Sequence, residues 1–70
     1  MIRVYVRDDV EEEDSRFLGE FSPAAIMQLP SLFEKFETVI KGSDGIAHFV
    51  AAQFVCDHTG VYFEIVVDRG

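Results

Sequence analysis

Residues 57–67, DHTGVYFEIVV, decide the fold. Asp57 and Gly60 stand at the first and fourth positions of a tetrapeptide, a pattern typical of a type I turn with a left-handed glycine bulge. After the turn, apolar side chains occupy every second position, as in a strand with one buried face. Residues 46–56 also fit a helical period, but the turn that follows them favours a strand. We therefore predict a long C-terminal hairpin.

The N-terminal part predicts a second hairpin. Residues 2–7 alternate between Ile2, Val4 and Val6 on one face and polar or aromatic side chains on the other, which is typical of a half-buried strand. Residues 17–21 read as a short second strand. The acidic run between them, residues 8–14, predicts a solvated loop, because like charges this close repel one another in a compact arrangement.

Two short helices are expected between the hairpins. Ser22 and Pro23 match the N-cap and first position of a helix. Pro30 lacks a backbone donor and should end that helix near Gln28. Residues 31–34, SLFE, match a capping box and predict a second helix that ends at Gly42. Its expected apolar face consists of Leu32, Phe33, Phe36, Val39 and Ile40, and Glu37 with Lys41 would form an ion pair one turn apart.

The resulting order is ββααββ. Seventy residues suffice for one domain, so we expect a single α+β domain over residues 1–70. Its sheet would be four-stranded and antiparallel, with one or two short helices on one face. Half of the sequence is hydrophobic and includes seven phenylalanines, which can supply the dense core that so small a domain needs.

The charge is concentrated in one place. The chain carries a formal net charge of −7, and six of its 13 acidic residues lie within residues 8–14. The rest of the chain is almost neutral. This distribution argues against direct binding of nucleic-acid phosphates or anionic membranes, which requires clustered Lys and Arg. The single cysteine excludes an intrachain disulfide and fits a reducing, cytoplasmic setting in whatever cell makes the protein.

No residue pattern identifies a catalytic or cofactor site. Cys56, Asp57 and His58 are adjacent, but a nucleophile pair needs groups that face each other with an orienting third group. A metal site needs three or four ligands, and only His48 could join them. We therefore expect no enzyme activity, no cofactor and no metal, with Cys56 a small core residue and His58 an exposed turn residue.

Two surfaces are candidates for binding a protein partner. The first is the acidic run, whose carboxylates are spaced about as closely as the phosphates of one DNA strand and could occupy a basic groove on another protein. The alternative is that the run only keeps the chain soluble. The acidic residues concerned are Asp8, Asp9, Glu11, Glu12, Glu13 and Asp14.

The second candidate is the sheet face away from the helices. A bulged turn would pair Asp57 with Val61 and Val55 with Phe63. The uncovered face would then display Ile46, His48, Val50, Ala52, Phe54 and Cys56 beside Tyr62, Glu64 and Val66. An apolar face of this kind predicts a homodimer or a partner site, unless a bent sheet buries it. We expect Tyr5, Phe54 and Tyr62 to be the anchoring residues, because aromatic side chains dominate interface energetics.

Four features occur together in this chain: its short length, the DDVEEED run at residues 8–14, the missing catalytic pattern, and the apolar surplus at Val50, Phe54, Tyr62 and Val66. In this combination the chain resembles the small acidic proteins with which phages disable bacterial defence, above all anti-CRISPR proteins. The resemblance implies a stoichiometric inhibitor that acts in the cytoplasm of a bacterial host and blocks a basic DNA- or PAM-reading surface on a Cas effector. The alternative is a homodimeric regulatory or adaptor protein, similar to an antitoxin, that assembles through its sheet face.

Overall fold

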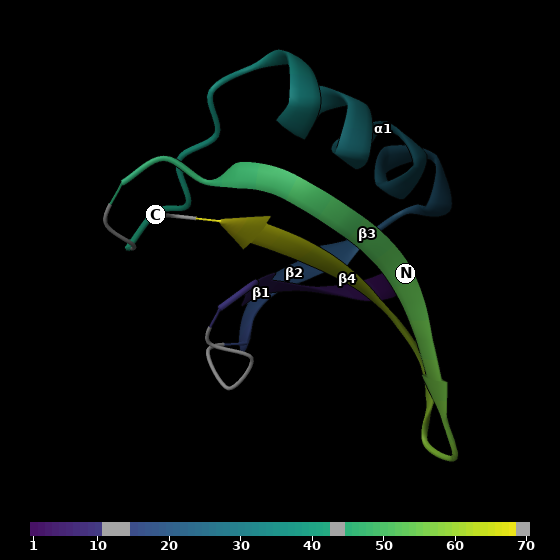
Figure 1. Cartoon of the computed structure of the whole chain (residues 1–70). Coiled ribbons are helices and arrows are strands. Elements are labelled where there is room, and N and C mark those ends of the chain that lie inside the picture. Colours follow the sequence, from purple (N-terminus) through teal and green to yellow (C-terminus); the bar gives the residue numbers. More distant parts are fainter. Residues whose placement is uncertain (11–14, 43–44, 69–70) are drawn as a thin grey trace.

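The computed structural model describes residues 1–10, 15–42 and 45–68. It confirms a small α+β fold with a four-stranded sheet and a helix on one side of it (Figure 1). The elements are β1 (Ile2–Asp8), β2 (Ser15–Phe21), α1 (Pro23–Lys35), β3 (His48–Asp57) and β4 (Gly60–Asp68).

The sheet is mixed, so the prediction of a purely antiparallel sheet was wrong. The strand order is β2-β1-β4-β3, and the two central strands, β1 and β4, run parallel. β4 contains five consecutive buried residues, from Phe63 to Val67. A strand that is buried on both faces belongs in the centre of a sheet. The connection through α1 leads from β2 to β3 at the opposite edge, and the β3–β4 hairpin then places β4 beside β1.

The middle of the chain forms one helix, where the sequence predicted two. Ser22 caps it as predicted, with its hydroxyl oxygen accepting a hydrogen bond from the backbone N–H of Ala25. Pro30 lies inside the helix. Ile26, before the proline, is buried, and Phe33, after it, packs against the same core. Burial of both side chains on one face offsets the backbone hydrogen bond that Pro30 removes.

The helix also ends earlier than predicted. Its C-cap is Phe36, and Thr38 makes an isolated antiparallel bridge with Ala47 instead of continuing the helix. Three consecutive β-branched residues, Thr38 to Ile40, lower the helix propensity at this point. The predicted helical pair of Glu37 and Lys41 therefore does not form within a helix.

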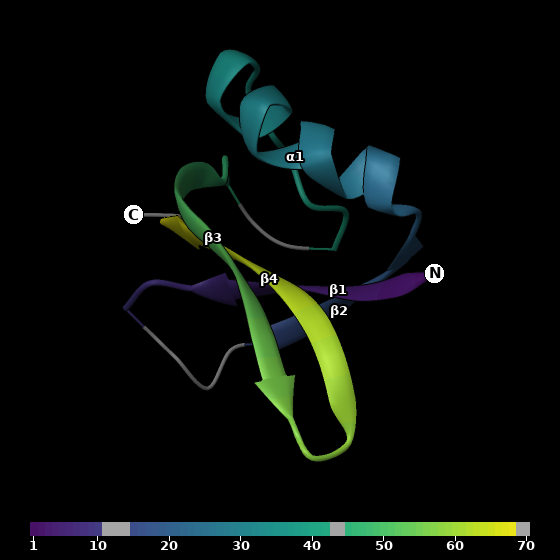
Figure 2. The ribbon, with the colours of Figure 1, turned by 90° about the vertical axis from the view of Figure 1, so that its right-hand side faces the viewer.

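The core lies between α1 and one face of the sheet. Val4, Val6, Phe63, Ile65 and Val67 supply its strand side, and Ile26, Ile40 and Ala47 close it from the helix side. α1 packs chiefly against β3. Figures 1 and 2 show the consequence: the turn between β3 and β4 projects away from the helix, and the end of this hairpin is left uncovered.

The turn of the long hairpin is tighter than predicted. Asp57 pairs with Gly60, and only His58 and Thr59 lie between them. The Asp57 carboxylate accepts hydrogen bonds from the backbone N–H of Thr59 at 2.8 Å and from its hydroxyl. Gly60 has φ +141°, a conformation that favours glycine. The hairpin register is consequently shifted by one residue from the predicted one, which exchanges the faces of β3.

Candidate partner-binding surface

Three aromatic rings meet on the sheet face that points away from α1. The rings of Tyr5 and Tyr62 lie 5.1 Å apart in an edge-to-face arrangement, and those of Tyr5 and Phe17 lie 5.4 Å apart. We call Tyr5, Phe17 and Tyr62 the aromatic cluster. No helix of the described residues lies on this face.

The strand alternation places this cluster. In β1, Val4 and Val6 point to the core, so Tyr5 between them points to the open face. In β4, buried Phe63 puts its neighbour Tyr62 on the same open face. Phe17 is paired with Tyr5 across the β1–β2 ladder. Cross-strand aromatic pairs of this kind stabilise a sheet, and they also offer rigid apolar area to a partner.

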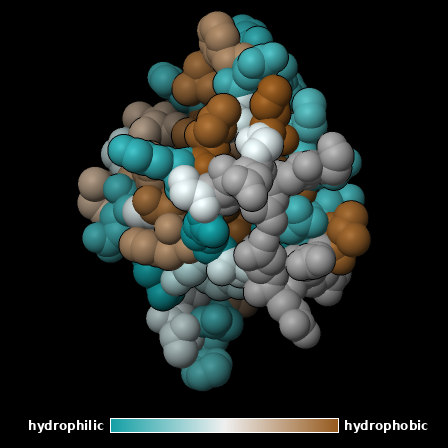
Figure 3. Space-filling model, turned by 90° about the vertical axis from the view of Figure 1, so that its left-hand side faces the viewer, coloured by the Kyte–Doolittle hydropathy of each residue, from teal (hydrophilic) through white to brown (hydrophobic). Residues whose placement is uncertain are grey.

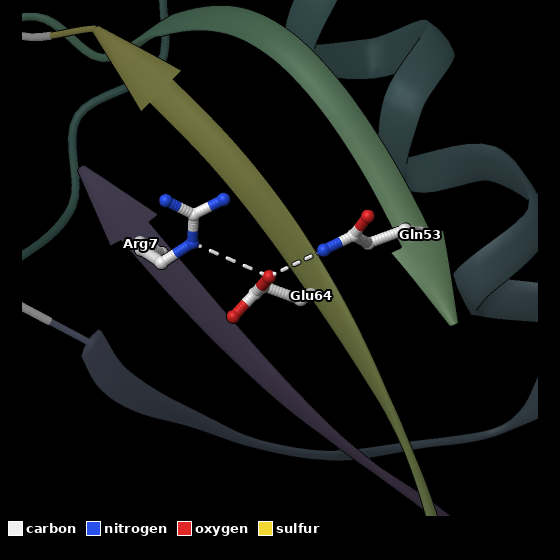
Figure 4. Close-up of polar contacts among 3 residues, drawn as sticks. All are labelled: Arg7, Gln53 and Glu64. Atoms are coloured by element: carbon white, nitrogen blue, oxygen red, sulfur yellow. Dashed lines mark hydrogen bonds and ion pairs between the residues drawn. The ribbon is translucent and has the colours of Figure 1, made fainter. Parts of the chain in front are cut away.

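A polar network lies beside the cluster on the open face. The guanidinium Nε of Arg7 lies 3.3 Å from Glu64 Oε1, and Gln53 Nε2 donates a hydrogen bond of 2.8 Å to the same oxygen (Figure 4). Glu64 is only 7% exposed. Since a buried carboxylate needs charged or hydrogen-bonding partners, this network fixes the side chains of three neighbouring strands. The open face is thus partly polar. Glu64 was predicted on this face, whereas Gln53 reaches it only because the hairpin register differs from the predicted one.

The end of the long hairpin makes the open face hollow. A depression of about 220 Å³ is lined by Arg3, Tyr5, Ser15, Asp57, Thr59 and Tyr62. Its lining joins aromatic rings from the cluster to one cationic and one anionic side chain. Such a mixture suits the binding of an amphipathic side chain of a partner.

Asp57 is ionised in this depression. Hydrogen bonds from the Thr59 side chain and backbone lower the pKa of Asp57 below its ordinary value, and the charge of Arg3 adds a smaller contribution. The carboxylate therefore keeps its negative charge in mildly acidic solution, together with its role in holding the turn.

The acidic residues lie at the end of β1. Asp8 is its last residue, and its carboxylate accepts a hydrogen bond of 2.9 Å from the backbone N–H of Val10. Asp9 is exposed, and its backbone N–H is bonded to the carbonyl of Val67. Tyr5 precedes Asp8 by three residues, which is about 10 Å along a strand. The predicted acidic residues from Glu11 to Asp14 lie outside the described residues.

The predicted anchor Phe54 does not lie on this face. Because the register is shifted by one residue, Phe54 pairs with Phe63, and the two rings make an edge-to-face contact at 5.1 Å on the helix side of the sheet. Ala52 likewise faces the core. The open face instead receives Gln53 and Val55, which pair with Glu64 and Tyr62. The predicted set of Tyr5, Tyr62 and Phe54 is therefore split between two faces.

A further apolar groove lies where α1 ends. Phe36 is 65% exposed and Val39 67% exposed, although the helical pattern placed both in the core. Phe33, Phe36, Ile46, Phe49 and Val50 line a groove of about 540 Å³ with several charged neighbours. Figure 3, which views the molecule from the side where α1 ends, shows hydrophobic side chains grouped in the upper half of this face. The β-branched run after Glu37 was the signal that could have revealed it.

The residues considered for chemistry are dispersed. Cys56 is exposed as a free thiol, which differs from the expected core position, and His58 is exposed in the turn as expected. His48 lies at the opposite end of β3 from both. Within residues 1–10, 15–42 and 45–68, no three His, Cys, Asp or Glu side chains are grouped so as to hold a metal ion. None of the helices formed by these residues is long and apolar enough to cross a membrane.

The comparisons with protein-family models, with curated proteins and with solved structures give no match for this chain.

Proposed function

We propose that this chain is a non-catalytic protein-binding module that acts through the open sheet face and the acidic end of β1. The observation that carries the proposal is the aromatic cluster. Tyr5, Phe17 and Tyr62 come from three adjacent strands and meet on a face that α1 leaves open. The rings stabilise the sheet through their mutual contacts, but Phe17 is still 52% exposed, and a group of exposed apolar side chains is typical of a surface that contacts a partner.

The chemistry of the partner follows from the charges beside the cluster. Asp8 is the last residue of the strand that carries Tyr5, Asp9 follows it, and the acidic run continues through Asp14 in the sequence. A partner with a basic surface next to an apolar pocket complements this arrangement. Long-range attraction speeds such an encounter, and the buried aromatic contact slows dissociation.

The narrower form of the proposal is an inhibitor of a nucleic-acid-binding defence complex, of the anti-CRISPR type. Closely spaced carboxylates compete with phosphates for Lys and Arg. The chain would then block a basic DNA- or PAM-reading surface on a Cas effector without any chemical step. The partner would lose its nucleic acid at one equivalent of this chain.

A competition experiment tests the narrower form. Guide-loaded Cas effectors of several types are mixed with labelled target duplex, and the chain is titrated in while the fluorescence anisotropy of the duplex is recorded. We expect release of the duplex from at least one effector, and no release by a variant in which Asp8, Asp9 and Asp14 are changed to Asn and Glu11, Glu12 and Glu13 to Gln.

A control for position is Glu34→Gln with Glu37→Gln, which removes two negative charges near the end of α1, away from the aromatic cluster. Asp8→Asn with Asp9→Asn removes the same number at the end of β1. The control at Glu34 and Glu37 should inhibit as well as the unmodified chain. Duplex release that is equally strong for the neutralised variant would contradict a role for the acidic run. No release from any effector would exclude the anti-CRISPR form and leave the broader protein-binding proposal to the capture experiment described below.

A further inference from the structure

The free edge of β3 is unlike the free edge of β2. Both strands lie at the ends of the sheet order. β2 carries Arg16, Gly19 and Glu20, residues that discourage pairing with another strand, whereas no charged residue occurs in β3 between His48 and Asp57. Natural sheets protect their edges with charges, prolines, bulges or short strands. Of these, β3 has only one bulge, between Phe49 and Ala51.

The C-terminal half of β3 is also bare on the helix side. α1 covers the first half, where Phe33 contacts Phe49 at a ring separation of 6.5 Å and Ala52 packs on the core. Beyond that point Phe54 is 57% exposed and Val61, across from Cys56, is 47% exposed. Figures 1 and 2 show this half extending away from α1. The hairpin thus presents an apolar patch directly beside an unprotected edge.

We propose that a second copy of this chain pairs antiparallel along the edge of β3. Downstream of the bulge, the regular part of the strand is residues 51–57. Antiparallel pairing of this segment with itself over its full length is centred on Phe54. Ala52 then lies opposite Cys56 of the second copy, and Gln53 lies opposite Val55. The two residues of each opposite pair are an even number of positions apart in the sequence, so both point to the same face of the sheet.

This register covers both exposed features of the hairpin, which are the unpaired edge of β3 and the apolar patch at Phe54 and Val61. The two-fold axis is perpendicular to the sheet, so both helices stay on the same side. The half of β3 that α1 covers is brought beside the bare half of the other copy, next to Phe54 and Val61. Asp57 meets Ala51 and no acid of the second copy. The pairing adds strand hydrogen bonds and apolar contact in one step, as in other cases of β-strand addition.

The pairing surface is separate from the aromatic cluster and the acidic end of β1. The two interactions also respond oppositely to salt. Each copy carries a net charge of −7, so the copies repel each other and salt should strengthen their pairing. Binding to a basic partner should weaken with salt. The pairing of two copies and the binding of a basic partner can therefore be tested separately, and the failure of one does not decide the other.

Directed disulfide formation tests the register. Ala52→Cys places a thiol opposite Cys56 of the second copy, at the Cα separation of about 5 Å that a disulfide requires. We expect mild oxidation to convert most of this variant to a covalent dimer. In the unmodified chain the two Cys56 residues are four positions out of register, about 13 Å apart, so little covalent dimer should form.

Ala51→Cys is the matched control, because the adjacent position faces the other side of the sheet. Sedimentation equilibrium of the unmodified chain at low and at moderate salt supplies a second measurement that depends on no variant. A dimer that dissociates on Phe54→Lys, together with selective cross-linking of Ala52→Cys, supports the proposal. A monomer at millimolar concentration, or cross-linking that is equal for Ala51→Cys and Ala52→Cys, would overturn it.

Discussion

Glu64 shows how one polar residue is accommodated within an apolar strand. It receives Arg7 from β1 and Gln53 from β3, and it is almost inaccessible to solvent. Removing one partner leaves a buried carboxylate poorly compensated, which costs about 1–3 kcal/mol. We predict that Arg7→Ala lowers the free energy of unfolding by this amount in urea denaturation. Arg3→Ala, on the same face and without this contact, should change it by less than about 0.5 kcal/mol, and equal losses for both variants would contradict the account.

Asp57 gives the hairpin turn a dependence on pH. Its hydrogen bonds from the Thr59 side chain and backbone hold its pKa below the ordinary value of an aspartate. A carboxylate whose pKa is depressed in the folded state contributes stability above its unfolded pKa, and loses it as the pH falls through the folded pKa. We therefore predict that the unmodified chain is more stable than Asp57→Asn at pH 6, and that the difference vanishes below the lowered pKa. Thermal melts of both proteins between pH 6 and pH 2 measure it, and a difference that persists at the acid end would be inconsistent with this mechanism.

At the level of elements, the helix persists across a proline. Pro30 removes the hydrogen bond to the carbonyl of Ile26. The helix therefore survives on the packing of its apolar face. We predict that Pro30→Ala stabilises the protein by about 1–2 kcal/mol, the restored hydrogen bond being partly offset by a more flexible unfolded chain. Pro23→Ala, at a position where proline costs nothing, should leave stability unchanged or slightly lower. Equal effects of both substitutions on the denaturation midpoint would show that Pro30 is not strained.

The positions of the strands could be predicted from the sequence, but the central pairing and the register of the long hairpin could not. All four strands were predicted near their observed positions, because alternation and turn residues are local signals. The parallel pairing of β1 with β4 depends on which strand is buried on both faces, and no local pattern states this. The turn was located correctly at Asp57 and Gly60. A one-residue difference in its loop length moved Phe54 to the other face and brought Gln53 and Val55 onto the open one.

The residues of the aromatic cluster were predicted only in part. Tyr5 and Tyr62 were predicted to share an exposed face, and the structure places their rings in contact. Phe17 was assigned to a strand but not to this face, because the bulge between Val4 and Tyr5 that turns it there has no sequence signal of its own. The polar network and the hollow formed by the hairpin end depend on sheet curvature and were not predictable. Whether the acidic run binds a partner stays a prediction.

At the scale of the whole molecule, the chain has two separate candidate binding surfaces. The aromatic cluster lies on the open face of β2, β1 and β4, and the acidic end of β1 follows Tyr5 along its strand. The free edge of β3, with its apolar patch on the helix side, lies at one end of the strand order. We propose that the first surface binds a basic partner and that the second binds another copy of the chain. A single small domain can hold two such surfaces because its sheet has two faces and two edges.

The most direct test of the central claim is capture of a partner from a bacterial lysate on the immobilised chain, at low and at moderate salt. Three proteins are compared: the unmodified chain, the variant with residues 8–14 neutralised, and Tyr5→Ala with Tyr62→Ala, each verified to be folded. The account predicts one stoichiometric partner that is retained by the unmodified chain, reduced by salt and lost from both variants. A partner retained equally by all three proteins, or the absence of any stoichiometric partner, would contradict the claim that the acidic end and the aromatic cluster form the binding surface.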